Sequence, residues 1–339
     1  MTVNLNGDMS QWTMGAAALP DMFRLHHAGA AVHTIARSTD VPDLGLARRK
    51  IPYSLEITVA TADASVGATD LTVLTYRGEG CEMQALGRAP IRQRLFLKGL
   101  PGVYNLHFSN GAETISRAQP LVLQHADMWT GFDVGTPEVP DFDGSWWSDS
   151  RVGYTIGLTL ACGANFQAEM ERWQSGLKFG TGGSNFNATV GNKLKIAGLR
   201  VGDGPLFYEA PEITERDCLR YLQTSFNRGQ APGQNLGWQN GESIAFAQAA
   251  GAVPQWSDRV ALSPMRIEPA MTGYNPGAGN AQARSFSHGD CTGTTFDAVR
   301  TNGFRWYATS PAGTTVGEHI GLGWVADARL PALTQNVGS

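Results

Sequence analysis

The amino-acid sequence predicts an all-β protein: a jelly-roll β-sandwich followed by a short helix and a second, smaller β-sandwich domain. Three observations predict this class. Apolar and polar residues alternate in short runs such as YSLEITVAT (Tyr53–Thr61), which is the pattern of a strand with one buried face. These runs are separated by turns rich in the 41 Gly and 17 Pro of the chain. Charged residues make up only 17%, below the roughly 25% of ordinary soluble domains.

The chain has 339 residues, which is more than one β-core usually fills, so we expect two domains. The first is predicted over residues 1–205. Its strands, in chain order, are MFRLHH, AAVHTIA, YSLEITVAT, LTVLTYR, IRQRLFLKG, VYNLHFSN, ETISRA, MWTGFDV, YTIGLTLAC and KLKIAGLRV. The last run closes with Leu194–Val201 and stops at Gly202. Short strands at this regular spacing are typical of a sandwich or jelly roll.

Residues 206–230 are predicted to be a linker that holds a short helix, from Glu215 to Phe226. Thr214 with Asp217 matches a capping box, and Leu222 lies on the apolar side of the helical pattern. Residues 231–339 then form the second β-domain. Its predicted strands are SIAFAQAA, RVALSPMRIEPAM, GFRWYATS and HIGLGWVADARL.

Two long Gly-rich loops lie between these later strands, over Arg228–Gly241 and Tyr274–Gly303. Loops of such length in a compact domain are usually functional or ordered by a partner. We therefore expect binding residues in both loops.

Composition excludes several classes of function. The net charge of −4 gives no field that would attract nucleic acid. No apolar window is long enough to cross a membrane, and the N-terminus lacks the pattern of a signal peptide, so we expect synthesis in a host cytoplasm. The cysteines match no metal-ligand spacing and are expected to be free, mostly buried thiols: Cys81, Cys162, Cys218 and Cys291.

No catalytic motif of the H-E-x-x-H, G-x-S-x-G or phosphate-loop type occurs, so we expect a protein that is not an enzyme. The alternative is a small polysaccharide depolymerase. Glycoside hydrolysis needs two carboxylates, which the loop PDFDGSWWSDS could supply from Asp141, Asp143 and Asp149. Closely spaced loop aspartates more often form turns or a cation site.

Sugar binding leaves a different pattern, because a sugar offers apolar C–H faces to a flat aromatic ring and hydroxyl groups to polar side chains. The candidate carbohydrate-binding residues are Trp146, Trp147, Asp141, Asp143, Asp149, Trp238 and Tyr274, all in polar, Gly-rich company. Other tryptophans lie in or beside strand patterns, where core packing is expected: Trp12, Trp129, Trp173, Trp306 and Trp324.

A series of segments runs in order along the chain: NGDMSQWTMG, RSTDVP, YSLEITVATADAS, GYTIGLTLACGANF, WQSG, LKIAGLRVGDG, ERDCLRYLQTSF, VALSPMRIEPAM, YNPGAG and VADARL. This series resembles a family of bacteriophage tail-fibre and virion receptor-binding (spike) proteins. The resemblance implies a carbohydrate-binding-module-like jelly roll, a short helix and a C-terminal β-domain. Related modules hold a structural calcium. Asp8 matches that pattern, but Gly198 stands where a second carboxylate would help, so no cofactor is expected and the metal ligands are unknown.

The resemblance implies a virion structural protein, a fibre or head-spike subunit of a phage or phage-like particle, that binds host capsular or surface polysaccharide during adsorption. Its expected location is the virion surface. Its other partners would be virion proteins and copies of itself, with a trimer favoured and a pentamer possible at a capsid vertex; no nucleic acid and no membrane insertion are expected. The alternatives are the depolymerase and a purely architectural decoration protein.

Overall fold

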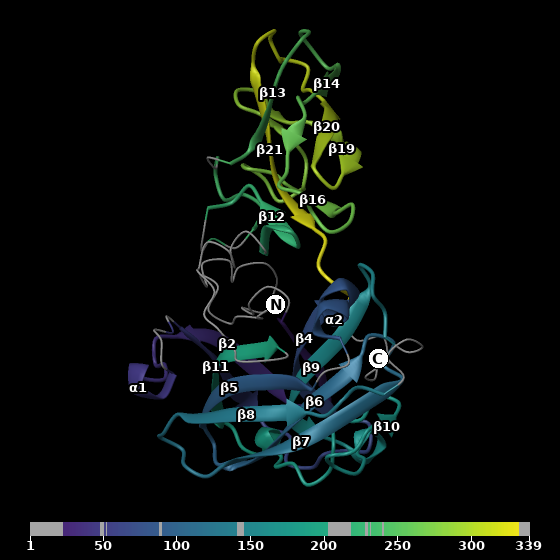
Figure 1. The fold of residues 1–339 in the computed structure, drawn as a ribbon. Coiled ribbons are helices and arrows are strands. Elements are labelled where there is room, and N and C mark those ends of the chain that lie inside the picture. The colour runs from purple at the N-terminus through teal and green to yellow at the C-terminus, as the bar shows by residue number, and fades with distance from the viewer. Residues whose placement is uncertain are drawn as a thin grey trace. The chain divides into compact units, whose positions relative to one another are not determined.

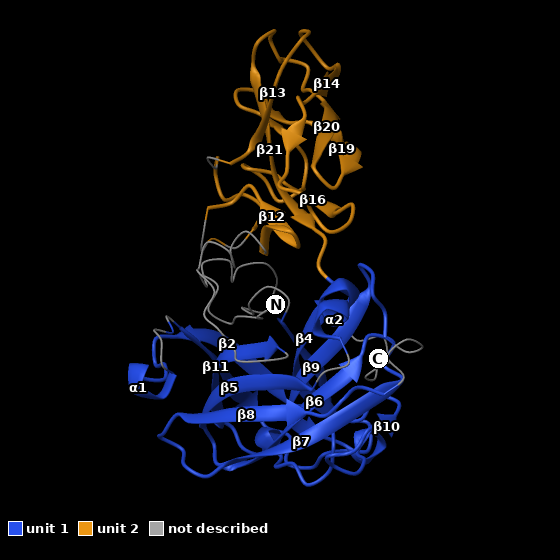
Figure 2. Cartoon of the chain, in the orientation of Figure 1, with its two compact units in different colours: residues 1–9, 16–214, 330–339 blue, residues 10–15, 215–329 orange. Residues whose placement is uncertain are grey.

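The computed structural model describes residues 23–47, 51, 53–87, 90–140, 146–202, 218–227, 230, 232–238 and 241–331. Strands dominate these residues, as predicted (Figure 1). The described part of the chain divides into two compact units (Figure 2). Unit 1 comprises its residues from 23 to 202 together with 330 and 331, and unit 2 those from 218 to 329. The predicted boundary at residue 205 lies outside the described residues.

Unit 1 is built from two antiparallel sheets. The strands of the first sheet, in spatial order, are β1 (Phe23–Ala28), β4 (Leu71–Glu79), β9 (Val152–Cys162), β6 (Gly102–Asn110), β7 (Ile115–Leu123) and β10 (Gln174–Ser175). Those of the second are β2 (Val32–Ser38), β3 (Ser54–Thr61), β11 (Lys193–Gly202), β5 (Ile91–Gly99) and β8 (Thr130–Thr136). Short helices lie between strands: α1 (Leu44–Ala47), α2 (Gly80–Leu86) and the 3-10 turns Ala164–Phe166 and Phe186–Ala188.

The closing strand of unit 1 is β11, where the alternating pattern of Leu194–Val201 predicted it. It lies between β3 and β5, and Leu194 and Ile196 are buried. The register shifts between Ala197 and Arg200, where Gly198 has φ +61° and lies against the ring of Phe96. A glycine tolerates both the left-handed backbone and the close ring, so this position carries a bulge.

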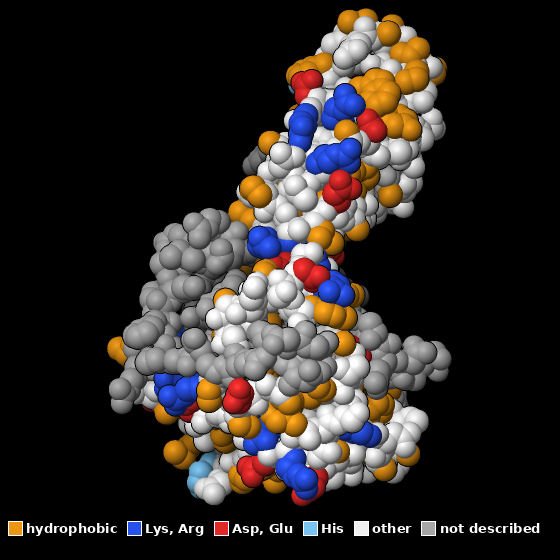
Figure 3. Space-filling view, turned by 45° about the vertical axis from the view of Figure 1, so that its right-hand side comes forward, with side chains coloured by type: hydrophobic (Ala, Val, Ile, Leu, Met, Phe, Trp, Pro, Cys, Tyr) orange, Lys and Arg blue, Asp and Glu red, His pale blue; other side chains and the backbone are white. Residues whose placement is uncertain are grey.

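Unit 2 also has two sheets. The larger contains β12 (Leu222–Thr224), β13 (Ser243–Phe246), β16 (Ala270–Tyr274), β17 (Arg284–Ser285), β18 (Gly289–Asp290) and β21 (His319–Asp327). The smaller contains β14 (Pro254–Trp256), β15 (Val260–Ala261), β19 (Thr292–Arg300) and β20 (Gly303–Thr309). On the surface of both units, Figure 3 shows apolar side chains mixed with charged ones.

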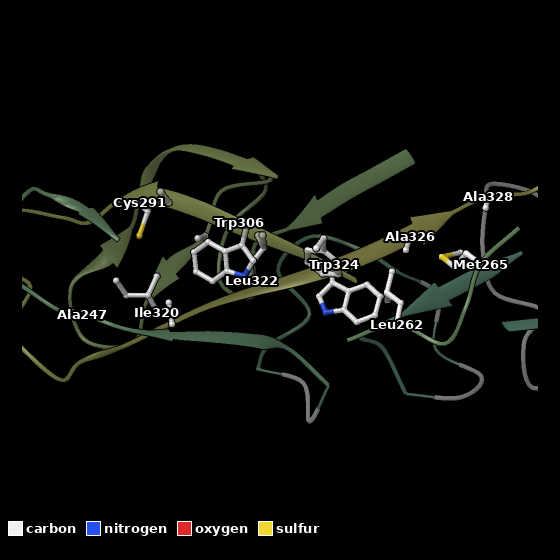
Figure 4. Close-up of a cluster of buried hydrophobic side chains, with 14 residues drawn as sticks. Ala247, Leu262, Met265, Cys291, Trp306, Ile320, Leu322, Trp324, Ala326 and Ala328 are labelled. Atoms are coloured by element: carbon white, nitrogen blue, oxygen red, sulfur yellow. The ribbon is translucent and has the colours of Figure 1, made fainter. Parts of the chain in front are cut away.

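The core of unit 2 lies between its two sheets (Figure 4). From β21 it takes Ile320, Leu322, Trp324 and Ala326, and from β20 Phe304, Trp306 and Ala308. Trp306 is fully buried, and its Nε1–H donates to Ser243 Oγ at 2.8 Å, which satisfies the one polar group of the ring. Trp306 and Trp324 are therefore core residues, as the strand patterns predicted.

Three expectations need correction. The predicted helix Glu215–Phe226 is helical at Cys218 and Leu219, but Leu222–Thr224 form β12. Pairing with β21 and burial of Leu222 outweigh the helical spacing of the apolar residues. The segment RVALSPMRIEPAM is not one strand, since β15 ends at Ala261 and β16 begins at Ala270. The predicted loop Tyr274–Gly303 contains β19, which forms a hairpin with β20.

The four cysteines, all among the described residues, form no disulfide, as expected, but they are less buried than predicted. Only Cys291 is buried; Cys81 is exposed, and Cys162 and Cys218 are half-buried. Burial raises the pKa of the Cys291 thiol to about 11, and the coulombic effects of Asp290 and Glu318 act in the same direction. This thiol therefore stays protonated at neutral pH.

Replacing Leu222 by Asp tests the strand assignment of this segment. Leu222 is 4% exposed and packs with Phe226 and Val325. The variant loses this packing and places a carboxylate among apolar side chains, so its free energy of unfolding should fall by about 3–5 kcal/mol. Val316→Asp, at a side chain that is 66% exposed, should change it by less than about 0.5 kcal/mol. Equal chemical-denaturation midpoints for the two variants would contradict the assignment.

Candidate functional site

The outer face of β21 carries two glycines. Because Ile320, Leu322 and Trp324 point into the core, the alternating residues point outward: His319, Gly321, Gly323 and Val325. A Cβ atom on Gly321 would lie 2.3 Å from Cζ3 of Trp238, and one on Gly323 would lie 3.3 Å from Cζ of Phe226. The two glycines therefore leave the space in which aromatic rings lie directly on the strand.

The rings on this face form what we call the aromatic row: Phe246, His319, Phe286, Trp238, Tyr274 and Phe226. Neighbouring centroids are 4.8 Å apart for Phe246 and His319, 5.4 Å for Trp238 and Phe286, and 5.2 Å for Phe226 and Tyr274. The most exposed rings of the row are Phe286 (67%), Phe246 (56%) and Trp238 (38%), whereas Phe226 at its other end is only 8% exposed. One end of the row is thus open to solvent and the other is closed.

Two sequence-predicted residues, Trp238 and Tyr274, are brought together on this face. Their loops lie side by side, since the backbone N–H of Asn235 donates to Asn275 O and that of Gly237 to Pro276 O. Tyr274 is opposite Gly323 in the register of β16 and β21. Burial raises the pKa of Tyr274, so its phenol stays protonated and can donate a hydrogen bond.

A chain of polar side chains runs beside the aromatic row. Asn275 Nδ2–H donates to Asn280 Oδ1 at 2.7 Å, Asn280 Nδ2–H donates to Asp290 Oδ2 at 2.6 Å, and Arg284 forms an ion pair with Asp290. Arg284 is opposite Gly321 in register, so it leaves the sheet on the same side as Trp238. Burial opposes ionisation of Asp290, but the hydrogen bonds from Asn275, Asn280 and Arg284 lower its pKa. The ionised carboxylate of Asp290 and the guanidinium of Arg284 thus lie on the same side of the sheet as the indole ring.

The turn that carries Phe286 is tied down by Glu318, whose side chain is 5% exposed. The carboxylate accepts hydrogen bonds from Ser285 Oγ–H, from His288 Nδ1–H, and from the backbone N–H groups of Ser287 and Thr315. Burial raises the pKa of Glu318, but these donors outweigh it and lower the value from 4.5 to about 2. Phe286 is therefore exposed on a turn whose base is fixed.

The site offers what a sugar requires. Trp238 and Phe286 give apolar faces for C–H groups, and Arg284 and Asp290 give a donor and an acceptor for hydroxyl groups. Asp290 and Glu318 both have lowered pKa values, so neither is protonated at neutral pH. The general acid of glycoside hydrolysis is a protonated carboxyl group, whereas these two carboxylates are held in the ionised form.

Trp146, on unit 1, is a core residue. It is 6% exposed, its Nε1–H donates to Pro140 O, and its ring lies 5.8 Å from that of Phe108 and 6.0 Å from that of Trp173. One face of the indole is thus stacked on Phe108, and Trp173 meets it edge-on. At 6% exposure Trp146 offers little area to a ligand, and its role in stacking on a sugar stays a prediction.

The neighbouring Trp147 is half-buried, and Arg151 Cζ lies 4.2 Å from the centroid of its ring. Asp149 is exposed and accepts hydrogen bonds from Arg151, which lower the pKa of its carboxyl group. Asp149 is therefore ionised at neutral pH. Asp141 and Asp143 lie outside the described residues.

Sequence reasoning missed Phe246, Phe286, Arg284 and Asp290. A signal for them exists in HIGLGWVAD, where the outward positions of a buried strand hold Gly-x-Gly. Glycine weakens a strand unless another group must approach the backbone closely. This pattern could have indicated that rings from other segments lie on β21.

Within the part of the chain that the structure describes, no three His, Cys, Asp or Glu side chains lie together in a way that could hold a metal ion. Asp8, which matches the calcium-site pattern of related modules, lies outside the described residues. The same part of the chain holds no helix that is long and apolar enough to cross a membrane.

No protein-family profile and no curated protein matches the chain. Solved structures do. The enzymatically active domain of bacteriophage CBA120 tailspike protein 4 is 12% identical, with a TM-score of 0.33, over 53% of this chain and 19% of that one. A family 11 carbohydrate-binding module of a Clostridium thermocellum cellulase is 9% identical (TM-score 0.33; 62% and 98% covered). The module TmCBM61, in complex with β-1,4-galactotriose, is 11% identical (TM-score 0.31; 61% and 99% covered).

Replacing Gly321 by Ala tests the packing of Trp238. The new methyl group would lie 2.3 Å from the indole, so the ring must leave β21. We expect the indole N–H resonance of Trp238, assigned by its loss in Trp238→Phe, to shift and broaden, and its solvent exchange to rise. Gly279→Ala is the control, because nothing lies within 4 Å of the added atom. An unchanged Trp238 resonance in Gly321→Ala would show that the ring does not lie on the strand.

The hydrogen bonds of Glu318 predict a pH dependence. Its pKa of about 2 in the folded protein lies below the ordinary value of 4.5, so the unfolded state binds the proton more tightly. The stabilising contribution is complete above pH 4.5 and is lost as the pH falls toward 2. The unfolding free energy, followed against pH, should fall more steeply in this window for the wild type than for Glu318→Gln. Parallel curves for the two proteins would exclude the assigned role of Glu318.

Proposed function

We propose that this protein is a virion structural protein, a fibre or head-spike subunit of a phage or phage-like particle, and that it binds host cell-surface polysaccharide through the aromatic row. The observation that carries the binding proposal is the open end of the row, where Trp238 and Phe286 face solvent beside Arg284 and Asp290. The virion assignment rests on the resemblance of the sequence segments to phage receptor-binding proteins.

The proposed binding mode follows from the geometry of the site. A pyranose ring stacks on the exposed part of the Trp238 indole and meets Phe286 at its edge, which removes apolar area of all three groups from water. The guanidinium of Arg284 donates to sugar hydroxyl groups, and Asp290 accepts from them. Side chains around Asp290 are already hydrogen-bonded to one another, so the site loses little side-chain entropy on binding.

The proposed activity is binding of the polysaccharide without hydrolysis. A glycosidase needs one protonated carboxyl group and one ionised one on either side of the scissile bond. The two acids beside the aromatic row, Asp290 and Glu318, are held ionised by the hydrogen bonds that they accept. The protein would therefore retain the polysaccharide chain rather than shorten it.

A site with one partly exposed indole binds a sugar weakly. Several copies of the site in a symmetric oligomer compensate for this weak affinity. Linking several sites raises the effective concentration of ligand at each one, with no new contacts. We therefore propose a homo-oligomer. The resemblance favours a trimer, and a pentamer would suit a capsid vertex.

Trp238→Ala tests the proposed function. Loss of ring stacking, worth about 1–1.5 kcal/mol, should weaken binding to purified host capsular polysaccharide about tenfold in titration calorimetry. Met128→Ala is the control: it removes an apolar side chain of unit 1 that is 62% exposed and belongs to no candidate site, and binding should be unchanged. Equal affinities of the wild type and Trp238→Ala would refute the assigned site.

A second measurement separates binding from cleavage. The wild-type protein is incubated with the same polysaccharide, and new reducing ends are measured. We expect none. Their appearance would establish the depolymerase instead. Absence of any polysaccharide binding, together with equal adsorption to capsulated and bare cells, would favour an architectural protein.

A further inference from the structure

A second aromatic surface lies on the smaller sheet of unit 2. Trp256 on β14 is directly opposite Tyr307 on β20, and Thr295 on β19 is opposite Tyr307 from the other side. The ring centroids of Trp256 and Tyr307 are 4.6 Å apart, with 39° between their planes. Trp256 is 43% exposed, Thr295 is exposed and Tyr307 is half-buried. Three neighbouring strands thus present an indole, a phenol and a hydroxyl group in one line.

Polar groups border this line. Asp297 is opposite Arg305 in register, and Arg305 Nη2 lies 3.1 Å from Asp297 Oδ2. The guanidinium is also close to the indole, with Arg305 Cζ 5.8 Å from the centroid of Trp256. On the other side of the line, Thr309 is opposite Thr292. A partly exposed aromatic pair is therefore flanked by a donor and an acceptor on one side and by hydroxyl groups on the other.

This surface is distinct from the aromatic row. Phe304, Trp306 and Ala308 of β20 point into the core, so Arg305, Tyr307 and Thr309 point away from it. The aromatic row lies on the outer face of β21, which belongs to the other sheet. The packed core of unit 2 separates the two faces. On the side of unit 2 where β14, β19 and β20 lie, Figure 3 shows apolar, basic and acidic side chains next to one another.

We propose that the outer face formed by Trp256, Tyr307, Thr295, Arg305 and Asp297 is a second saccharide-binding site, and that it takes a neutral, hydroxyl-rich sugar ring. This proposal takes only the ligand class, a saccharide, from the proposed function, since none of these residues belongs to the aromatic row. Trp and Tyr supply rigid, amphipathic area at a low cost in entropy, and their tilt leaves both rings accessible to one sugar or to two successive ones.

Charge specifies the neutral ligand. The ion pair of Arg305 with Asp297 is exposed, with side-chain exposures of 46% and 41%. Such exposed pairs contribute little to stability, so both groups can turn to a ligand at little cost. Arg305 then donates to one sugar hydroxyl and Asp297 accepts from a neighbouring one. The pair has no net charge, and a uronate would meet the carboxylate of Asp297 as well as the guanidinium.

The same observations disfavour a purely structural role for these rings. An indole that is 43% exposed on β14, at the edge of its sheet, retains unfavourable contact with water in the free protein. Two faces on opposite sides of one unit would let each subunit hold two polysaccharide strands, or two stretches of one strand. Either arrangement multiplies weak affinities.

The test uses the full chain and defined probes: neutral oligosaccharides of glucose, galactose and mannose, and matched uronic acid oligomers. Binding is followed by the indole resonance of Trp256 and by calorimetry. We expect one or more neutral oligomers to shift this resonance and to bind about tenfold more weakly to Trp256→Ala. Affinity should change less than twofold between low and high salt, since no net charge is neutralised.

Variants separate this proposal from the proposed function. Asp297→Asn keeps the shape of the face and removes an acceptor, so it should weaken neutral-sugar binding several-fold without lowering the melting temperature. Trp238→Ala should leave the Trp256 response intact. If Trp238→Ala alone abolishes all binding, the second site is refuted and the first stands. If only Trp256→Ala weakens binding, the second site stands and the first is refuted. Binding only of uronates at Trp256, or of no oligomer there, overturns the proposal.

Discussion

The whole of unit 2 depends on one strand with two incompatible tasks. One side of β21 fills the core with Ile320, Leu322 and Trp324, and the middle of its other side carries no side chain at Gly321 and Gly323. At Gly321 and Gly323, aromatic rings from other segments lie against the backbone of β21, where side chains of the strand itself would clash with them. The space that the two glycines leave sets the position of Trp238. It also sets the depth at which Phe226 and Tyr274 are buried.

Pairing explains why this strand has so large an effect. β12, β13, β16 and β17 are all hydrogen-bonded to β21, so its register fixes where each of them presents its outward residue. Ile244 and Arg284 face Gly321 from opposite sides, and Phe246 faces His319. The aromatic and polar members of the candidate site are therefore positioned by backbone hydrogen bonds. In contrast, the face around Trp256 depends on β20, whose inward side holds Trp306 in the same core.

Alternation was sufficient to predict the fold class and the closing strand of unit 1, because period-2 burial leaves a clear pattern. Leu222 was misassigned, since a short apolar run fits a helix and a strand equally well until its pairing partner is known. Trp146 and Trp147 are adjacent in the same loop, yet one is in the core and the other beneath Arg151. Only tertiary packing separates them. Trp238 and Tyr274 were predicted as binding residues because the sequence around them is Gly-rich, whereas Trp256 lies on a strand and carried no such signal.

A structure of the protein with an oligosaccharide from the host capsule tests the central claim most directly. The account predicts a sugar ring on the outer face of β21, in van der Waals contact with Trp238 and Phe286 and hydrogen-bonded to Arg284 or Asp290. A ligand bound solely to unit 1, with the outer face of β21 covered by another protein chain or left in water, would contradict it.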